Sequence, residues 1–341
     1  MLNGYDIIGD IHGCADKLKA LLTRLGYSKT DGVWKHPERM AIFLGDYIDR
    51  GPQILETLNI VRAMQEAGEA ICLMGNHEFN AIGWNTPDPD APGEYLRRHT
   101  EAHALQHAET LDQLAGLYEY WVDWMRKLPL WLELGDLGGK GGRLHMVHAC
   151  WSPDAMAVLL QSERNGETAV RGRHDAPIMS ARGYIPAGRD RDSIEFHAVD
   201  TLLKGPEVAL PDEATFTDKD GAIRDSMRVK WWLNPAATCR EMALMGQDDA
   251  ESIPEGLSFP RDEWAAIPVE WPTFFGHYWR SPDEPVTVYG PKLACLDFSA
   301  VKGGPLVAYQ WNRGDSELHD ENFVILTEEE AERPAPKAFF P

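Results

Sequence analysis

The sequence predicts an α/β protein whose sheet is covered by helices, because short apolar segments alternate with amphipathic segments of helix length. The first segment of strand length is Tyr5–Ile8, and the loop 9–13 follows it. Leucines then recur at i, i+3, i+4 and i+7, the spacing of one helix face: Leu18, Leu21, Leu22 and Leu25. Gly26 is expected to end this helix.

The same strand–loop–helix unit is repeated. Met40–Leu44 is a predicted strand, the loop 45–52 follows it, and Ile54–Ala67 is a predicted helix. A third apolar run, Ala70–Met74, leads into a polar loop at 75–78. In sheets built from such units, polar side chains that follow the strands gather at the carboxyl edge, where α/β proteins place their sites.

The rest of the chain is less regular. Residues 85–92 are rich in Pro and Asp and predict a loop, 93–127 predict helix, and Leu144–Val147 predicts a strand. Residues from about 152 to 270 are interpreted as an irregular insertion, a lid or small subdomain over the site. Three more strands are expected at Val286–Tyr289, Leu293–Phe298 and Leu306–Trp311. We therefore expect one catalytic domain, 1–341, that contains this insertion.

Composition limits the classes of function. The 341 residues are 43% hydrophobic and 26% charged, which excludes a mainly disordered chain. The formal net charge is −21, from 33 Lys and Arg against 54 Asp and Glu. Such a charge repels polyanions, so we expect no long nucleic acid as a partner. No membrane partner is expected either.

Cysteine usage and the N-terminus bear on location. The five cysteines are scattered and form no CxxC pair, which favours a reducing compartment. The first residues show no signal-peptide pattern, and no apolar run reaches about 18 residues. A cytoplasmic protein is the expectation.

Three glycine-bounded loops carry the chemistry: GDIHG at 9–13, GDYIDRG at 45–51 and GNHE at 75–78. Each follows a predicted strand and brings Asp, His or Asn to the strand end. His148 and His277 follow two later apolar segments in the same way. Carboxylate, imidazole and amide donors without a thiolate suit hard-to-borderline divalent metals.

Together these loops and the two later histidines resemble the calcineurin-like metallophosphoesterases, in particular the branch of the phosphoprotein phosphatases and symmetrical diadenosine tetraphosphatases. The resemblance covers residues 5–78 closely and includes two short segments at 145–149 and 274–278. It implies a four-layer α/β/β/α sandwich with a dinuclear metal centre.

The resemblance also implies metal ligands. Asp10, His12 and Asp46 would hold one metal, and Asp46 would bridge to a second metal completed by Asn76, His148 and His277. A bridging carboxylate suits two dications about 3.5–4 Å apart. Manganese is the favoured metal, with iron and zinc as alternatives.

The resemblance also implies catalytic roles for three residues of these loops. Arg50 would bind phosphoryl oxygens, and His77 would protonate the leaving oxygen, with Asp49 orienting its imidazole. A hydroxide bridging the metals would attack phosphorus. A second phosphate-binding arginine is expected, with Arg280 preferred over Arg173 and Arg182.

Several alternatives stay open. Phosphomonoester hydrolysis leads, dinucleoside polyphosphate hydrolysis follows, then phosphodiester hydrolysis, and a non-catalytic scaffold is the alternative from another class. The partner would be a phosphorylated small molecule, a nucleotide or a phosphoprotein; the oligomeric state is not predicted. His99, His103 and His107 recur every four residues, and a solvated or partly packed helix face is preferred over an extra metal site.

Overall fold

Two facing β-sheets form the centre of the protein. The computed structural model describes residues 2–135, 142–164, 169–171, 177–179, 184, 188, 193–217, 223–233, 238–244, 250–259, 267–327 and 330. Arg173, Arg182 and the end of the chain lie outside these residues. Among the described residues, no helix has the length and apolar character needed to cross a membrane.

The first sheet has the strand order β17-β16-β1-β4-β5. Its parallel part is β1 (Gly4–Ile8), β4 (Arg39–Phe43) and β5 (Ala70–Cys72). Two later strands, β16 (Leu306–Asn312) and β17 (Phe323–Leu326), extend it in antiparallel pairing. The three loops that carry the chemistry therefore follow three neighbouring parallel strands.

The second sheet has the order β15-β14-β7-β6. In it, β14 (Thr273–Phe275) lies parallel to both β7 (Leu144–Val147) and β15 (Leu293–Cys295). The edge strand β6 (Trp131–Leu134) pairs with β7 in antiparallel fashion. His148 and His277 thus follow two neighbouring parallel strands of this sheet.

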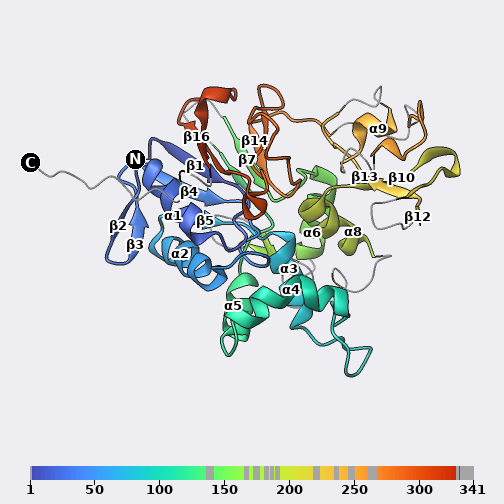
Figure 1. The fold of residues 1–341 in the computed structure, drawn as a ribbon, viewed down its shortest axis with the longest axis horizontal. Coiled ribbons are helices and arrows are strands. Elements are labelled where there is room, and N and C mark those ends of the chain that lie inside the picture. The colour runs from blue at the N-terminus through green and yellow to red at the C-terminus, as the bar shows by residue number, and fades with distance from the viewer. Residues whose placement is uncertain are drawn as a thin grey trace, which may run out of the picture.

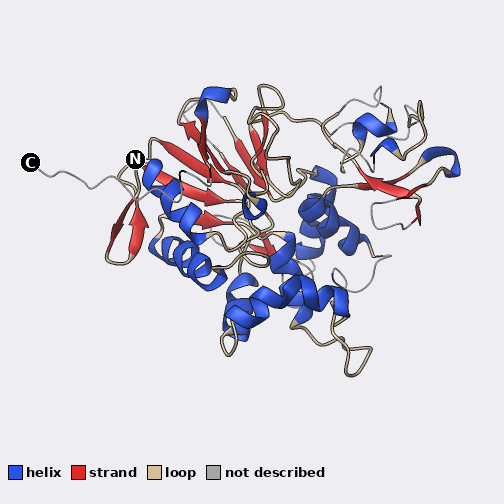
Figure 2. Ribbon diagram, in the orientation of Figure 1, coloured by secondary structure: helices blue, strands red, loops and turns tan. Residues whose placement is uncertain are grey.

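The sheets pack face to face with helices outside, giving the expected α/β/β/α sandwich (Figure 2). Ile42 of β4 and Met146 and Phe274 of the second sheet share the inner core, while Phe43 and Phe275 belong to the outer one. This alternation follows from the two-residue period of a strand. Helices α1 (Ala15–Arg24) and α2 (Ile54–Ala67) cover the first sheet, and α6 (Pro153–Arg164) and α8 (Ile194–Lys204) lie on the other side (Figure 1).

The region around 76–127 differs from the sequence prediction. Asn76 does not lie in a loop but begins α3 (Asn76–Trp84). The predicted helix at 93–127 is two helices, α4 (Glu101–Gln113) and α5 (Tyr118–Met125). Helix α4 begins late because the hydroxyl of Thr100 caps it, accepting a hydrogen bond from the His103 N–H.

Within 152–270, the residues that the structure describes are more regular than the sequence suggested. Besides α6 and α8, they contain β8 (Ala169–Arg171), β9 (Pro177–Met179), β10 (Glu207–Ala209), β11 (Phe216–Thr217), β12 (Ile223–Arg224), β13 (Ser226–Arg228) and α9 (Cys239–Met242). Side chains from 210–259, including Leu210, Val229 and Met242, form a small separate core. Figure 1 shows β10, β12, β13 and α9 at the opposite end of the molecule from the N-terminus.

One predicted strand is wrong. Residues 286–289 form no strand, because their polar backbone groups bond to side chains: the Thr287 carbonyl accepts from Arg280, and the Val288 N–H donates to Asp320. The sequence analysis also missed the edge strands β6 and β17 and a short hairpin, β2 (Ser28–Thr30) with β3 (Val33–Lys35).

Candidate metal centre and catalytic residues

The carboxyl ends of the parallel strands of both sheets meet at one cluster of buried side chains. Asp10 and His12 follow β1, Asp46 follows β4, His148 follows β7 and His277 follows β14. All are buried except His277, which is partly exposed. The topology therefore brings together residues that lie more than 260 positions apart in the chain, as in the 3.1 Å hydrogen bond from the His277 N–H to Asp10 Oδ2.

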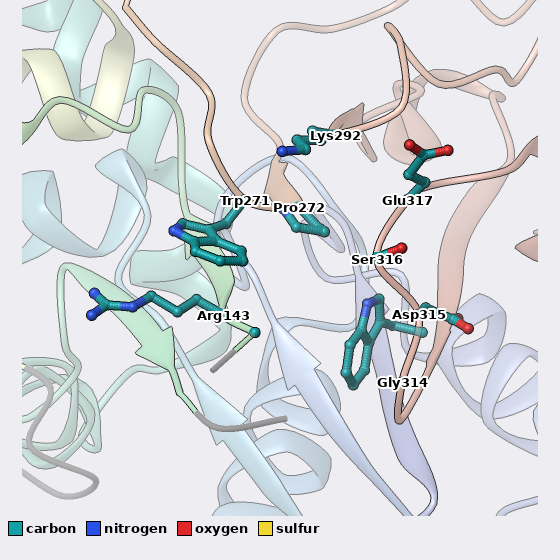
Figure 3. Close-up of a pocket in the computed structure, with 10 residues that line it drawn as sticks. Arg143, Trp271, Pro272, Lys292, Gly314, Asp315, Ser316 and Glu317 are labelled. Atoms are coloured by element: carbon teal, nitrogen blue, oxygen red, sulfur yellow. The ribbon is translucent and has the colours of Figure 1, made fainter. Parts of the chain in front are cut away.

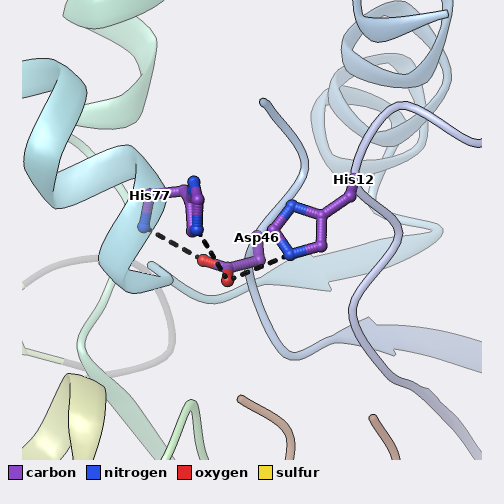
Figure 4. A group of neighbouring side chains, drawn as sticks. All are labelled: His12, Asp46 and His77. Atoms are coloured by element: carbon purple, nitrogen blue, oxygen red, sulfur yellow. Dashed lines mark hydrogen bonds and ion pairs between the residues drawn. The ribbon is translucent and has the colours of Figure 1, made fainter. Parts of the chain in front are cut away.

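Two groups in this cluster have the geometry of metal sites. His12, Asp46 and His77 form one, and Asp46, His148 and His277 form the other, with the ligand atoms of each group within 4.8 Å of one another. Figure 4 shows His12 and His77 approaching the Asp46 carboxylate from opposite sides. Asp46 Oδ2 lies 3.5 Å from His12 Nε2, and Oδ1 lies 3.4 Å from His148 Nε2. One carboxylate is thus shared by both groups.

Backbone carbonyls orient two of the imidazoles. Nδ1 of His12 donates to the Ile48 carbonyl at 2.8 Å, and Nδ1 of His148 donates to the Leu44 carbonyl at 2.9 Å. Both rings therefore present Nε2 to Asp46, the arrangement usual for metal-binding histidines. Burial lowers the pKa of His12 to about 3, so its Nε2 carries a free lone pair at neutral pH.

The second group also contains Asn76. Its Oδ1 lies 3.0 Å from His148 Nε2 and 2.9 Å from His277 Nδ1. Burial lowers the pKa of His148, but Asp46 and Asp10 outweigh it and raise that pKa to about 10. A metal ion at Nε2 would displace the proton, so binding would release protons.

Asp10 supplies the clearest sign that a cation belongs here. Its Oδ1 is buried and has no hydrogen-bond partner among the described residues, and the same holds for His12 Nε2. Burial, together with the nearby carboxylates Asp297 and Asp46, raises the pKa of Asp10 well above its ordinary value. Buried acceptors without partners are costly, and a divalent cation would satisfy them. The donor set therefore fits two metal ions.

His77 and Asp49 form a tight pair beside this centre. Nδ1 of His77 lies 2.5 Å from Asp49 Oδ2, and the His77 N–H donates to Asp46 Oδ1 at 3.1 Å. Burial lowers the pKa of His77, but Asp46 and Asp49 outweigh it, so the pKa lies above its ordinary value. Such a histidine is suited to donate a proton from Nε2.

The loop that carries Asp46, Asp49 and Arg50 is held in an unusual conformation. These three residues have φ values of +54°, +63° and +69°. The Glu78 carboxylate accepts from the Asp46 and Tyr47 N–H groups, at 2.8 Å each, and stabilises this turn. Positive φ at non-glycine residues costs free energy and is typical of functional sites.

Arg50 lies beside the same centre, because the Trp279 ring on which it packs is also close to the His12 ring, with ring centroids 6.3 Å apart. Its guanidinium carbon lies 3.8 Å from the centroid of the Trp279 ring, and the Lys302 ammonium lies 3.8 Å from that centroid as well. Nη1 of Arg50 is buried and has no hydrogen-bond partner among the described residues. A planar guanidinium fixed in this way is suited to bind phosphoryl oxygens.

Arg280 is not brought into this group, contrary to the sequence prediction. Its Nη2 donates to the Pro285 carbonyl at 2.9 Å, Nη1 donates to the Thr287 carbonyl and Nε donates to Glu284. Its guanidinium also packs on the rings of Tyr289 and Phe298. The side chain therefore stabilises the loop after β14.

Three buried residues next to the site were not predicted from the sequence. His107 Nδ1 and Thr110 Oγ1 of α4 both contact Asp49 Oδ1, at 2.6 and 2.5 Å. Their spacing of three residues places them on one helix face, which was the available signal. Asp297, which follows β15 as Asp10 follows β1, accepts from the Trp279 N–H at 2.9 Å and fixes the loop after His277.

A separate cavity lies at the other end of the sandwich. It has a volume of about 380 Å³ and is lined by residues that include Arg143, Trp271 and Lys292 (Figure 3). These residues precede β7, β14 and β15, so the cavity lies at the opposite strand ends from the histidine and carboxylate cluster. It takes no part in the candidate metal centre.

The sequence of this chain matches a known family model. Residues 5–210 match the family model described as calcineurin-like phosphoesterase. The chain belongs to this family. Calcineurin-like phosphoesterases use dinuclear metal centres, in agreement with the two His and Asp groups that share Asp46.

Curated relatives match parts of the chain. The chain is 46% identical over 74 residues to bis(5'-nucleosyl)-tetraphosphatase PrpE [asymmetrical] of Bacillus subtilis, covering 21% of this chain and 30% of that protein. It is 32% identical over 181 residues to the symmetrical bis(5'-nucleosyl)-tetraphosphatase of Hamiltonella defensa, covering 52% of this chain and 55% of that protein. The chain thus matches only about half or less of these relatives' lengths.

Solved structures with similar folds are distant in sequence. A cold-active protein tyrosine phosphatase is 17% identical with a TM-score of 0.48, covering 98% of this chain and 81% of that one. A serine/threonine phosphatase of Saccharomyces cerevisiae is 15% identical with a TM-score of 0.44, covering 95% and 79%.

Proposed function

We propose that this protein is a metal-dependent hydrolase of phosphoric esters and anhydrides, with phosphomonoesters as its leading substrate class. The observation that carries the proposal is the His77–Asp49 pair, 2.5 Å apart, beside the Asp46 carboxylate. His77 Nε2 lies 3.9 Å from Asp46 Oδ2, farther than His12 Nε2 at 3.5 Å, so we assign His77 as the proton donor and not as a metal ligand. A proton donor next to a dinuclear centre is what displacement at phosphorus requires.

The metal ligands are part of the proposal. Asp10 and His12 would hold one cation and Asn76, His148 and His277 the other, with Asp46 between them. Manganese is favoured, and iron and zinc suit the same donors. When bound, two divalent cations supply Lewis-acid activation of the phosphoryl group and of the attacking water.

Side chains of this protein would do the remaining work. Arg50, held against Trp279, would bind the free oxygens of a terminal phosphate and so orient the phosphorus for in-line attack. His77 would give its Nε2 proton to the leaving oxygen. Asp49 would keep the His77 ring oriented, because it accepts the hydrogen bond from Nδ1. Arg280 is not included, since its guanidinium is engaged elsewhere.

A second substrate class has support of its own. The relatives of Bacillus subtilis and Hamiltonella defensa are named as bis(5'-nucleosyl)-tetraphosphatases. Hydrolysis of dinucleoside polyphosphates is therefore the alternative. We further propose one catalytic domain in which residues of about 152–270 are an insertion. A cytoplasmic location is part of the proposal, and it agrees with the scattered positions of the five cysteines, which form no CxxC pair.

Phosphate release tests the proposal. Metal-free protein is reloaded with Mn²⁺, and its metal content is measured. It is then offered p-nitrophenyl phosphate, a phosphoserine peptide, diadenosine tetraphosphate and bis-p-nitrophenyl phosphate. We expect turnover of the monoesters that depends on added metal. Preferential cleavage of the tetraphosphate would replace the leading substrate class by the alternative.

A variant of the proton donor makes the test specific. His77→Asn should keep its metal and lose about a hundredfold or more in kcat on the phosphoserine peptide, since a general acid contributes about 10²–10⁴-fold. The exposed His319 provides the matched control, His319→Asn, which should behave as the parent protein. If two metals are bound per chain and none of the four substrates is hydrolysed, the protein is a non-catalytic scaffold.

A further inference from the structure

Asp49 is shared by two histidines. Nδ1 of His77 lies 2.5 Å from its Oδ2, and Nδ1 of His107, which comes from α4, lies 2.6 Å from its Oδ1. A carboxylate only accepts hydrogen bonds, so both Nδ1 atoms donate to it. The carboxylate thus forms a bridge between the candidate proton donor and a histidine that takes no part in the proposed mechanism.

His107 is itself fixed in place. It is buried, and its Nε2 lies 2.8 Å from the hydroxyl of Tyr118, which donates to the Ala81 carbonyl of α3 at 3.1 Å. His77 also lies on α3. The series of contacts therefore starts at α3, passes through α5 and α4 to Asp49, and returns to the His77 side chain. Such a closed set of hydrogen bonds restricts each ring to one orientation.

Thr110 completes the set on the same face of α4. Its hydroxyl donates to Asp49 Oδ1 at 2.5 Å and accepts from the Asp49 N–H at 2.9 Å. Asp49 has a φ of +63°, a backbone conformation that needs support from its surroundings. His107 and Thr110 both donate hydrogen bonds to Oδ1, so Oδ2 is left to accept the hydrogen bond from His77. Helix α4 therefore sets the orientation of the Asp49 carboxylate relative to the His77 imidazole.

We propose that His107 is a positioning residue for proton transfer: it holds Asp49 so that His77 presents Nε2 to the leaving oxygen. The inference rests on the proposed function, because it needs His77 as the proton donor. The proposal predicts that replacing His107 lowers the rate of hydrolysis most for substrates whose leaving group needs a proton. The reason is that small errors in the geometry of proton transfer cost large factors in rate.

The two histidines that precede His107 do not share this role: His103 lies on α4, whereas His99 lies before the helix begins at Glu101. His103 is partly exposed, and its Nδ1 bonds to the Arg98 carbonyl at 2.8 Å. His99 stacks between the rings of Trp84 and Tyr95. The regular spacing of three histidines in the sequence therefore marks three different environments, of which only that of His107 reaches the site.

The experiment compares leaving groups on the full-length protein loaded with Mn²⁺. Phenyl phosphate needs a proton on its departing oxygen, whereas p-nitrophenyl phosphate needs it much less. We expect His107→Leu to lower kcat on phenyl phosphate by about tenfold to a hundredfold and to change kcat on p-nitrophenyl phosphate by less than about threefold. His107→Asn, whose amide nitrogen can donate to Asp49, should restore most of the loss.

Control variants separate the possible failures. His103→Leu, on the same helix, should leave both rates unchanged, and His77→Asn defines the full loss of the proton donor. If His107→Leu affects both substrates equally, or behaves as His103→Leu, the positioning role is wrong. If His107→Leu does not fold, Tyr118→Phe removes the hydroxyl at Nε2 and must give the same leaving-group dependence on a smaller scale. A parent protein that hydrolyses neither substrate would instead refute the proposed function.

Discussion

Single glycines determine how closely carboxylates of the site approach the backbone. A Cβ atom at Gly276 would lie 2.0 Å from Asp10 Oδ1, and one at Gly75 would lie 2.1 Å from Asp46 Oδ1. Both distances are far below van der Waals contact, so any side chain at these positions would displace a candidate ligand. The glycines of the motifs thus provide space for the donor atoms as well as tight turns.

Gly276→Ala tests this reasoning at the residue scale. We expect the methyl group to push Asp10 away and to lower the metal content of purified protein by about one ion per chain, since even the loss of a residue that only orients a ligand typically costs a metal site about 10–100-fold in affinity. The measurement is elemental analysis after dialysis against a fixed Mn²⁺ concentration. Gly135→Ala is the control, because nothing lies within 4 Å of a Cβ there. Two ions in both variants would contradict the assignment of Asp10.

Most residues of the candidate site could be predicted from the sequence, because each of them follows a predicted strand. Asp10 and Asp46 lie in glycine-bounded loops after recognisable strands, and Asn76 begins the helix that follows a third strand, so their meeting at one sheet edge follows from topology. His107 could not be assigned, because its contact with Asp49 depends on where α4 packs. The prediction for Arg280 rested on its closeness to His277 in sequence, which says nothing about the carbonyl groups that bind its guanidinium in the structure.

At the scale of elements, an ion pair joins α8 to the hairpin strand β13. Asp200 of α8 accepts from Arg228 of β13 at 2.6 Å and from Lys204 at 2.7 Å. Burial raises the pKa of Asp200, but Lys204 and Arg228 outweigh it, so the pKa lies below its ordinary value. The ionised carboxylate therefore stabilises the contact between these elements.

Asp200→Asn should consequently destabilise the protein in a pH-dependent way. A carboxyl whose pKa is lower in the folded than in the unfolded chain stabilises the fold above the unfolded pKa, about 3.9, and this contribution is lost as pH falls through the folded pKa. We expect a loss of about 1–3 kcal/mol in the free energy of unfolding near pH 7 that shrinks below about pH 4.

Denaturant unfolding over that pH range measures the difference. Glu195→Gln, on the same helix, is the control for the loss of a negative charge and should cost less than about 0.5 kcal/mol. A loss for Asp200→Asn that stays constant from about pH 7 to about pH 3.5 would show that the ion pair does not stabilise the fold.

Elements were predictable where local patterns decided them. Helix α2 has the predicted bounds, Ile54–Ala67, because its apolar spacing and the left-handed Gly68 at its end are local signals. The segment 286–289 was predicted incorrectly, since its apolar residues suit a strand but Arg280 and Asp320 bind its backbone. Helices α6 and α8 were not predicted, because the Pro, Gly and acidic residues around them obscure the helical spacing of their apolar residues.

At the scale of the whole molecule, the net charge of −21 opposes the approach of every anionic substrate. Two bound dications would cancel only four of these charges. Arg50 and Lys302, which both pack on Trp279, provide two positive charges near the site, but this is a small number against the net charge, and all of these charges are screened over the same Debye length. Long-range repulsion should therefore control how often a highly charged substrate reaches the site.

Ionic strength should reveal this repulsion. The Debye length falls from about 20–30 Å near 0.02 M salt to about 8 Å at 0.15 M. Raising NaCl over this range should increase kcat/KM for diadenosine tetraphosphate severalfold, about 3–10-fold, and that for p-nitrophenyl phosphate, which carries less charge, by a smaller factor. Potassium chloride must give the same result if screening is the cause. A fall in kcat/KM for both substrates would show instead that positive charge around Arg50 dominates the encounter, and the acidic exterior would then have no part in substrate selection.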